Sequence, residues 1–256
     1  MSVLHGKRIV LGVSGGIAAY KTVDLASKLT QAGALVDTIL THSATQFVTP
    51  LAFETMTHRP VHVDVFEQWT EGSKGHITLA NEADALVVAP ATANVIARMA
   101  WGMADDMLTV THLAAIPRGI PFLIVPAMEH HMFKHPATQA NLEMLRSRGA
   151  RVVGPEPGRL ASGANGTGRM VSVEQIIGCL EAALGANGPL AGRHIVVTAG
   201  ATRESVDPIR ILTNRSSGKM GYAIARAALH AGARVTLISA PTNLVPVVGA
   251  AFIPIE

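Results

Sequence analysis

The sequence predicts an α/β protein with a doubly wound, Rossmann-like or flavodoxin-like parallel sheet, followed by the first βαβ part of a second Rossmann-like domain. Three observations predict this fold class. Short apolar, β-branched segments alternate with segments whose apolar residues recur at helical spacing. Small and polar residues follow the apolar segments, as at the strand ends of open sheets. The turn-forming stretch 185–189 separates two such series, so we expect one domain over residues 1–185 and an incomplete one over 189–256.

The first strand is expected over Lys7–Val13, because this short apolar run suits a parallel strand that is buried on both faces. Ser14–Gly16 follows as a tight turn into a helix that ends at Gly33, and residues 34–40 form the second strand. A glycine turn between a strand and a helix N-terminus can hold a phosphate. The glycines do not fit the dinucleotide pattern G-x-G-x-x-G, and a turn that needs glycine only for its backbone angles accounts for them equally well.

The centre of the first domain is expected within residues 75–108. An apolar strand over Ala85–Ala89 ends at Pro90, and small or hydrogen-bonding side chains follow up to Asn94. Because ligands bind beyond the carboxyl ends of strands in open α/β sheets, this exit is the expected ligand site. His76, one helix upstream, adds an imidazole that can act as an acid or a base. On its spacing alone, however, such a histidine is more often a surface or packing residue.

The remainder of the first domain is less regular. Segment 50–74 shows no pattern that predicts an element. Further elements are expected downstream: strands over 120–126 and 150–153, a helix from 135 between them, and a helix over 173–184. Residues 154–169 are rich in glycine, and we expect a loop there, either a functional lid or a flexible connector.

The second domain is expected to begin with a βαβ unit. Its elements are strands over 193–198, 234–239 and 251–255, a loop over 199–217 and a helix over 218–231. A parallel sheet this small is marginal on its own, so we interpret the region as the front of a larger domain.

Composition excludes several classes of protein. Hydrophobic residues make up 48% of the chain and charged residues only 15%, which favours large buried interfaces and hence a homo-oligomer. No apolar run is long enough for a membrane span, and the N-terminus lacks the pattern of a signal peptide. A net charge of +3 with scattered Lys and Arg, and 4% aromatic residues, argue against nucleic-acid binding. The single cysteine, Cys179, fits a reducing cytoplasm.

No metal site is expected. The spacing of His130, His131 and His135 matches no standard zinc pattern, so a loop surface is the simpler interpretation. Asp105 and Asp106 are expected at a helix start, where the helix dipole favours acids, and not as a catalytic pair.

A series of motifs then occurs in the order and spacing of one known family. The motifs are Gly15–Lys21, His76–Ile77, Pro90–Asn94, Pro126–Met128 and Gly163–Met170, followed by Thr198–Glu204, Asp207–Arg210 and Thr213–Gly221. On these motifs the chain resembles the bacterial bifunctional phosphopantothenoylcysteine decarboxylase / phosphopantothenate–cysteine ligases of coenzyme A biosynthesis. The resemblance covers essentially the whole chain. It implies a decarboxylase domain over 1–185 and an incomplete ligase domain over 189–256.

The resemblance implies FMN as cofactor and 4′-phospho-N-pantothenoylcysteine as substrate, which a carboxy-lyase reaction converts to 4′-phosphopantetheine. The residues implied for FMN are Gly15, Gly16, Ile17, Ser43, Thr92, Ala93, Asn94 and Ala127. His76 matches the catalytic base of the family, and Met128, Glu129 and Arg169 match positions that bind substrate. Ser162 lies in the segment that resembles the substrate clamp. The family also implies a homotrimer or larger homo-oligomer.

Two residues depart from the family pattern. Glu129 stands where an asparagine is common; an ionised carboxylate would repel the carboxylate of the substrate unless it is protonated, points away or is neutralised nearby. Ser162 stands at the position of a proton-donating cysteine. Because a hydroxyl is a much weaker acid than a thiol, water or another group would have to donate the proton.

In the second domain, Arg210 and Asn214 match residues that handle an acyl-cytidylate in the ligases. Mg²⁺ and CTP are implied only if this domain is functional, and a complete CTP site is not expected. Two other classes of function remain open. The first is a regulatory FMN-binding subunit without catalysis. The second is a related flavoprotein with another substrate, such as a peptide-cysteine decarboxylase or a flavin prenyltransferase.

Overall fold

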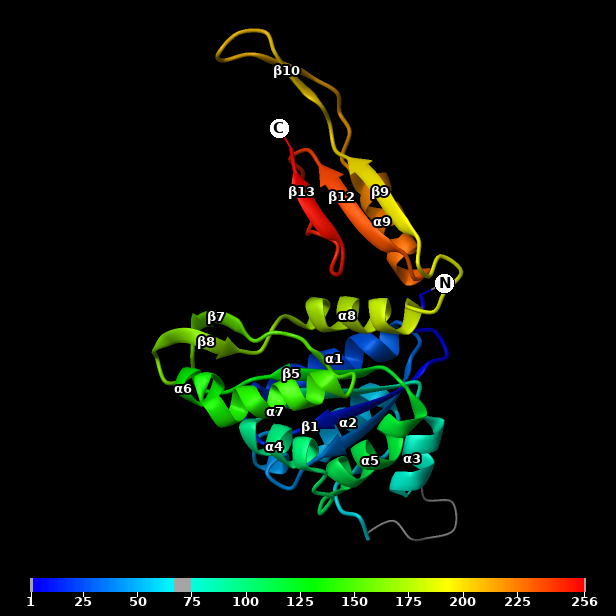
Figure 1. Ribbon diagram of the computed structural model, residues 1–256, viewed down its shortest axis with the longest axis vertical. Coiled ribbons are helices and arrows are strands. Elements are labelled where there is room, and N and C mark those ends of the chain that lie inside the picture. Colours follow the sequence, from blue (N-terminus) through cyan, green and yellow to red (C-terminus); the bar gives the residue numbers. More distant parts are fainter. Residues whose placement is uncertain (1, 67–74, 256) are drawn as a thin grey trace. The chain divides into compact units, whose positions relative to one another are not determined.

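The computed structural model describes residues 2–66 and 75–255 (Figure 1). The chain divides into two compact units, unit 1 up to Ile177 and unit 2 from Gly178. This division falls inside helix α8 (Val173–Gly185), upstream of the linker predicted at 185–189. A division by contacts does not test the predicted domains 1–185 and 189–256, which stay predictions. No helix in the described part of the chain is long and apolar enough to cross a membrane.

Unit 1 contains a six-stranded parallel sheet, which confirms the predicted fold class. Its strand order is β3-β2-β1-β4-β5-β6, the order of a doubly wound sheet, in which the chain leaves β1 first toward one edge and then toward the other. The strands are β1 (Arg8–Val13), β2 (Leu35–Leu40), β3 (Val61–His62), β4 (Ala85–Ala91), β5 (Phe122–Pro126) and β6 (Arg151–Val152).

The central strands are buried on both faces because their residues are apolar without alternation. Every residue of β4 and of β5 is buried, as are the last five residues of β1. In the pairing of β1 with β4, Gly12 lies opposite Val88, so the two strands end side by side. This pair is the switch point of the sheet, where a crevice forms between the diverging chains.

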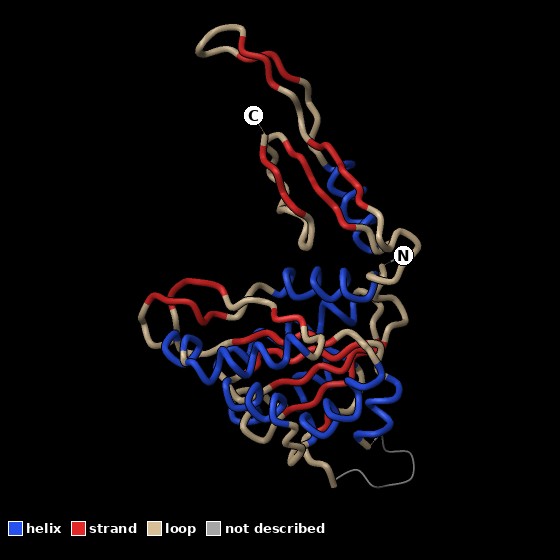
Figure 2. The backbone as a smooth tube through the Cα atoms, viewed as in Figure 1, coloured by secondary structure: helices blue, strands red, loops and turns tan. Residues whose placement is uncertain are grey.

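Helices cover both faces of this sheet (Figures 1 and 2). They are α1 (Tyr20–Gln31), α2 (Pro50–Thr57), α3 (His76–Glu82), α4 (Ala93–Trp101), α5 (Met107–Ala115), α6 (His130–Lys134) and α7 (Pro136–Ser147), with short 3-10 turns η1 (Ile17–Ala19), η2 (Ala44–Gln46) and η3 (Ile116–Arg118). The expected role of Asp106 at a helix start is confirmed, because its carboxylate accepts the Thr109 N–H at 2.8 Å.

Several elements of unit 1 were not predicted, among them strand β3 in segment 50–74. Helix α2 lies in the segment that showed no pattern, where Pro50 suits the first turn of a helix; residues 67–74 of that segment lie outside the described part. Helix α6 follows β5 directly. The glycine-rich segment expected to be a loop is an antiparallel hairpin of β7 (Glu156–Arg159) and β8 (Asn165–Arg169). Its sequence has few strand-forming residues, and contacts with α6 described below hold it in place.

Unit 2 is built on a three-stranded parallel sheet in the order β13-β12-β9, as the sequence predicted. The strands are β9 (His194–Ala199), β12 (Arg234–Ser239) and β13 (Ala251–Pro254), and helix α9 (Lys219–His230) packs on β9 and β12. The predicted loop 199–217 is wrong in part, because it contains an antiparallel ribbon of β10 (Arg203–Ser205) and β11 (Ile211–Thr213). All six residues of this ribbon are exposed, so no burial pattern marked it in the sequence.

Candidate functional site

The ends of three strands of unit 1 meet at the glycine turn that follows β1. A side chain at Gly15 would come within 2.9 Å of the Ser43 carbonyl oxygen, so the turn lies directly on the segment that follows β2. Gly16 faces the segment that follows β4: a side chain there would lie 3.4 Å from Cγ2 of Thr92. Gly15, Gly16, Ser43 and Thr92, all predicted from the sequence, therefore form one cluster. We call this group of residues the strand-end cluster.

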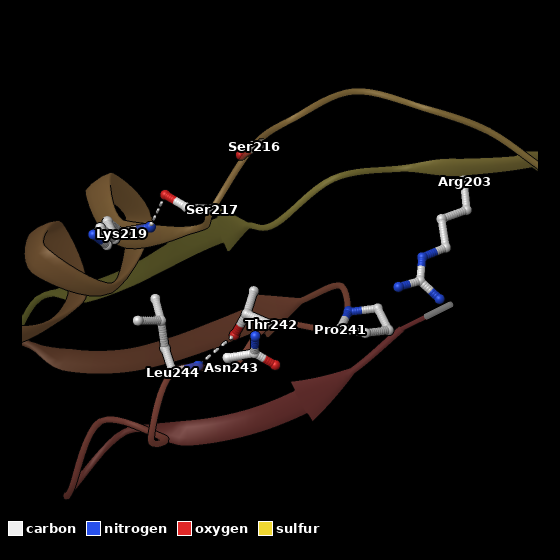
Figure 3. Close-up of a pocket in the computed structure, with 8 residues that line it drawn as sticks. All are labelled: Arg203, Ser216, Ser217, Lys219, Pro241, Thr242, Asn243 and Leu244. Carbon is white, nitrogen blue, oxygen red and sulfur yellow. Dashed lines mark hydrogen bonds between the residues drawn. The ribbon is translucent and has the colours of Figure 1, made fainter.

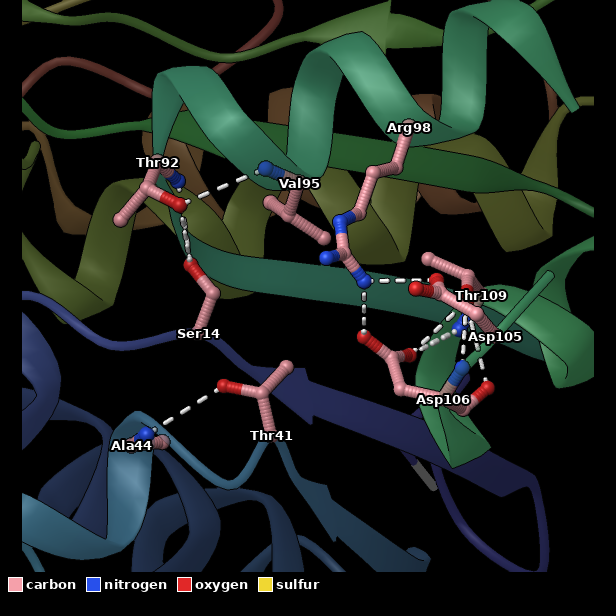
Figure 4. A network of polar contacts seen from close by, with 9 residues as sticks. All are labelled: Ser14, Thr41, Ala44, Thr92, Val95, Arg98, Asp105, Asp106 and Thr109. Atoms are coloured by element: carbon pink, nitrogen blue, oxygen red, sulfur yellow. Dashed lines mark hydrogen bonds and ion pairs between the residues drawn. The ribbon is translucent and has the colours of Figure 1, made fainter. Parts of the chain in front are cut away.

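The exit of β4 is fixed by hydrogen bonds (Figure 4). Thr92 is the N-cap of α4, and its hydroxyl accepts the Val95 N–H at 3.5 Å. The buried Ser14 hydroxyl donates to the Pro90 carbonyl at 2.7 Å and accepts the Thr92 N–H at 3.0 Å. Asn94, in the first turn of α4, is exposed. The start of a helix, with its free N–H groups, thus faces the glycine turn across the crevice.

The exit of β5 joins the same edge of the sheet. The Ala127 N–H donates to the Ala91 carbonyl at 3.1 Å, which ties the predicted residue to the end of β4. The Met128 N–H donates to the Gly168 carbonyl at 3.0 Å. A side chain at Gly168 would overlap the Met128 carbonyl oxygen, so glycine is required where β8 approaches this exit.

Glu129 turns toward its own helix. As the N-cap of α6, its carboxylate accepts N–H groups of His131 at 2.7 Å and Met132 at 3.3 Å, and Nδ1 of His131 lies 3.0 Å away. Partial desolvation raises the pKa of Glu129, but these hydrogen bonds outweigh it and the net shift is downward. The structure thus shows the Glu129 carboxylate turned into the start of its own helix, where backbone N–H groups and the His131 ring contact it.

The hairpin carries two further predicted residues. Ser162 lies exposed in the turn between β7 and β8. Two backbone hydrogen bonds close this turn: the Leu160 N–H donates to the Ala164 carbonyl at 2.8 Å, and the Gly163 N–H donates to the Leu160 carbonyl at 2.9 Å. The Arg169 guanidinium pairs with Glu156 across the two strands at 3.3 Å. Neither side chain reaches the glycine turn through any contact found among the described residues.

His130 anchors this hairpin, a role that the sequence did not reveal. Its Nδ1 accepts the Thr167 N–H at 2.9 Å, and a side chain at Gly166 would come within 2.8 Å of its ring. The predicted loop surface is therefore wrong for His130, whose ring lies half-buried under β8. In the described part of the chain, no three His, Cys, Asp or Glu side chains are grouped as a metal site requires.

His76 lies apart from the strand-end cluster in the single chain. It opens α3, whose other end is tied to the start of β1, where the Asp84 N–H donates to the Arg8 carbonyl at 2.8 Å. Seven helical residues rise about 10 Å, whereas the seven residues of β4 span roughly 20 Å. Figure 1 accordingly shows α3 and α6 at opposite ends of unit 1. The Nδ1 atom of His76 is buried and has no hydrogen-bond partner among the described residues.

Unit 2 has a separate hollow of about 440 Å³ (Figure 3). Its lining residues are Arg203, Ser216, Ser217, Lys219, Pro241, Thr242, Asn243 and Leu244. The lining contains two cationic side chains and no acidic one, which suits an anionic ligand.

The predicted ligase residues Arg210 and Asn214 do not line this hollow. Nε of Arg210 donates to Asp207 at 2.5 Å, and Oδ1 of Asn214 accepts the Ser216 N–H at 2.9 Å. The hydrogen bonds from the Arg210 and Ile209 N–H groups, together with the Arg210 side chain, lower the pKa of Asp207.

The chain is similar to known protein families and to curated proteins. The family described as Flavoprotein matches residues 2–185, and the family described as DNA/pantothenate metabolism flavoprotein C-terminal domain matches residues 190–256. The coenzyme A biosynthesis bifunctional protein CoaBC of Bacillus subtilis is 48% identical over 257 residues, which cover 99% of this chain and 63% of that protein. The chain thus spans about three fifths of the length of the curated relatives it matches.

Two solved structures are similar to unit 1. A mutant of PPC decarboxylase complexed with pantothenoylaminoethenethiol is 31% identical, covers 69% of this chain and 97% of its own, and has a TM-score of 0.62. The FMN binding protein AtHal3 is 30% identical, covers 69% of this chain and 95% of its own, and has a TM-score of 0.59.

Proposed function

The chain belongs to the Flavoprotein family, and from this membership we propose that it is an FMN-dependent decarboxylase of 4′-phospho-N-pantothenoylcysteine. The product is 4′-phosphopantetheine, and the reaction is a step of coenzyme A biosynthesis. The observation that carries the proposal is the strand-end cluster, in which a glycine turn faces a helix start across the switch point of a doubly wound sheet. We assign the activity to the cytoplasm, in keeping with the single cysteine.

The residues of the strand-end cluster fit FMN. Backbone N–H groups at a glycine turn and at a helix N-terminus favour a phosphate, and Gly16 leaves room beside Thr92. We assign FMN contacts to Gly15, Gly16, Ile17, Ser43, Thr92, Ala93, Asn94 and Ala127. Bound FMN supplies the two-electron chemistry that makes loss of carbon dioxide from the cysteine end of the substrate easy, and the protein supplies orientation and proton transfer.

We assign the role of catalytic base to His76 and propose that it serves the cluster of a neighbouring copy. Two observations support this. In its own chain His76 lies apart from the cluster, at the start of α3. Large apolar side chains beside the cluster are exposed in the single chain: Ile17 60%, Tyr20 61%, Phe47 47% and Leu51 69%. A homo-oligomer, which we propose to be a trimer or larger, would cover these side chains and bring His76 to the FMN.

The hairpin β7–β8 is proposed to close over the substrate. It is fastened to Met128 and His130 at the exit of β5, so its turn, with Ser162, extends from the edge of the sheet that carries the cluster. We assign substrate contacts to Met128 and Arg169. Glu129 lies beside them, and its charge is already compensated within α6, which lessens the repulsion of a substrate carboxylate.

For unit 2 we propose an anion-binding role at the hollow and do not expect phosphopantothenate–cysteine ligase activity from it. Arg210 and Asn214 are engaged in local turns outside the hollow. CTP with Mg²⁺ is implied only for a functional ligase unit, and its triphosphate is an anion of the kind that the cationic lining of the hollow would accept.

The proposal is tested with the purified chain. We expect a flavin absorbance spectrum and release of carbon dioxide from 4′-phospho-N-pantothenoylcysteine, with 4′-phosphopantetheine identified by mass spectrometry. Flavin without turnover would favour a regulatory FMN-binding subunit. Turnover of a cysteine-terminated peptide, or prenylation of the flavin, in place of the expected reaction would favour a flavoprotein with another substrate. Absence of bound FMN, even after its addition, would overturn the proposal.

A further inference from the structure

Ser14 occupies the point where β1 and β4 separate. Its side chain is 2% exposed, and no position of the sequence motifs includes it. The hydroxyl donates to the Pro90 carbonyl at 2.7 Å, accepts the Thr92 N–H at 3.0 Å and lies 3.3 Å from the Thr92 hydroxyl (Figure 4). The side chain that directly follows β1 is thus bonded to two backbone groups at the exit of β4.

These bonds replace the sheet ladder where it stops. The paired register of β1 and β4 ends at Gly12 and Val88, and one more backbone bond follows, from the Ser14 N–H to the Pro90 carbonyl at 3.3 Å. The chain then turns away from β4 at Gly15. The Thr92 N–H, directly beyond the end of β4, therefore has no backbone acceptor on β1, and the Ser14 hydroxyl takes this place. A hydroxyl suits the position because it donates one hydrogen bond and accepts two.

We propose that Ser14 is a positioning residue for the FMN site: its hydroxyl holds the exit of β4, and with it Thr92 and Asn94, at a fixed place opposite the Gly15–Gly16 turn. The proposal rests on the proposed function of the strand-end cluster. Ser14 acts through Thr92, whose own hydroxyl caps α4. The distance between the Gly15–Gly16 turn and the exit of β4 is therefore fixed before FMN binds.

Loss of the hydroxyl would appear mainly in the affinity for FMN. In the Ser14→Ala variant the Pro90 carbonyl keeps the Ser14 N–H, so the fold retains one of the bonds. The Thr92 N–H would lose its acceptor and, at the mouth of the crevice, would turn to water. Binding of FMN would then have to restore the exit to its place, at a cost to affinity that the native chain does not have.

The experiment compares Ser14→Ala with Ser14→Thr, which keeps a hydroxyl, and with Thr111→Val as a matched control. Thr111 is fully buried, and its hydroxyl donates to the Met107 carbonyl at 2.7 Å inside α5. We measure the dissociation constant of FMN by flavin fluorescence, the visible circular dichroism of bound FMN, and the melting temperature of each chain without FMN. We expect Ser14→Ala to bind FMN about tenfold more weakly with altered dichroism, and Ser14→Thr and Thr111→Val to bind within about threefold of the native chain.

The outcomes separate this inference from the proposed function. If the native chain binds FMN and Ser14→Ala binds it equally well with the same dichroism, the positioning role is overturned and the proposed function stands. If Thr111→Val loses as much affinity as Ser14→Ala at a matched loss of melting temperature, the effect is one of general stability, which also overturns it. A native chain that binds no FMN overturns the proposed function and the positioning role together.

Discussion

Unit 1 and unit 2 both end parallel strands beside the start of a helix and join these ends to one another, but they do so with different groups. In unit 1 the Ser14 hydroxyl bridges two strands, and Gly15 packs on Ser43. In unit 2 the strand ends pack backbone on backbone: a side chain at Gly200 would come within 3.0 Å of the Ala240 carbonyl oxygen. Close strand ends are thus common to both units, and the difference lies in the side chains beside them, which are hydroxyls in unit 1 and two exposed cationic groups at the hollow of unit 2.

The two antiparallel ribbons, one in each unit, differ in how they are held. The hairpin β7–β8 is fastened to the rest of unit 1 by His130 and by the Met128 N–H. The described hydrogen bonds of β10–β11 run within the segment itself, as from the Thr213 hydroxyl to the Thr202 carbonyl at 2.8 Å. The first ribbon is therefore placed by the fold, whereas the second has no contact that fixes its orientation among those described.

The largest effect is expected at His76, the proposed catalytic base. The change His76→Asn should lower the rate of decarboxylation by about 100- to 10,000-fold, the usual contribution of a general base, while FMN still binds. Steady-state release of carbon dioxide and the flavin spectrum measure both quantities. Retention of the native rate in His76→Asn would exclude His76 as the base.

Mixing variants sharpens this test, because His76 is proposed to act on a neighbouring copy. Chains that carry His76→Asn and chains that carry Gly15→Ala should each be poorly active alone. After dissociation and reassembly together, some interfaces would combine an intact cluster with an intact His76, and activity should return in part. No recovery in verified mixed oligomers would contradict a site shared between copies.

The next effect tests the cluster itself with two neighbouring glycines. The change Gly15→Ala introduces a methyl group that overlaps the Ser43 backbone, and it should lower FMN affinity by about ten- to a hundredfold. The change Gly16→Ala places its methyl group at an ordinary contact distance of 3.4 Å from Thr92 and is expected to alter affinity by less than about threefold. Titration with FMN measures both, and equal affinities in the two variants would contradict the role of the turn.

The sequence predicted the parts of the fold that depend on burial. Continuous apolar runs marked β1, β4 and β5, and the motifs led to the family that comparison confirms. Of the candidate site, the sequence identified the residues that the strand ends bring together, such as Gly15 and Thr92, because small and polar residues directly after a buried strand are typical of a ligand site.

The remaining features depend on tertiary contacts that leave little local signal. The hairpin β7–β8 consists of glycine, proline and polar residues, and its place is set by Gly168 against Met128 and by His130. From the sequence, Ser14 was expected only as a turn residue. The register of β1 with β4 is needed to see that its hydroxyl continues the hydrogen-bond ladder between the two strands. A side chain that substitutes for a backbone bond cannot be recognised before the pairing is known.

Lowering the pH should decrease the free energy of unfolding of unit 1 through His112. Burial, aided by the charge of Arg148, lowers the pKa of His112 from 6.5 to about 4. Between pH 6.5 and 4 the unfolded chain therefore binds a proton that the folded chain does not, so the free energy of unfolding of unit 1 should fall as the pH falls. The shift corresponds to a total loss of about 3 kcal/mol at pH 4, and above pH 6.5 this loss is absent.

Denaturant unfolding followed by tryptophan fluorescence measures this loss, because Trp101 lies in α4 of unit 1 and the sequence of unit 2 contains no tryptophan. The control is His112→Leu, whose apolar side chain would line the same apolar hollow of about 130 Å³ and cannot titrate. Its stability should depend less on pH than that of the native chain over this range. Parallel pH profiles of the two proteins would show that His112 remains accessible to protons in the folded state.

The smallest effect is expected at the anchor of the hairpin, and it bears directly on the difference between the ribbons. Replacing His130 by Ala removes the acceptor of the Thr167 N–H and the ring that packs on Gly166. Loss of one such bond is worth about 1 kcal/mol, so amide exchange within β8 should accelerate by about fivefold. Exchange within β10–β11, which lacks such an anchor, should be fast in both proteins. Hydrogen exchange followed by mass spectrometry measures the two ribbons in one experiment.

The neighbouring His131→Ala change is the matched control, because that imidazole is exposed and contacts Glu129 instead of β8. It should leave exchange in the hairpin unchanged. If β8 exchanges equally slowly in the native chain and in both variants, the Met128–Gly168 bond alone holds the hairpin, and His130 only fills space beneath it. If His130→Ala instead makes the amides of β8 exchange as fast as those of β10–β11, the His130 imidazole alone accounts for the difference in protection between the two ribbons.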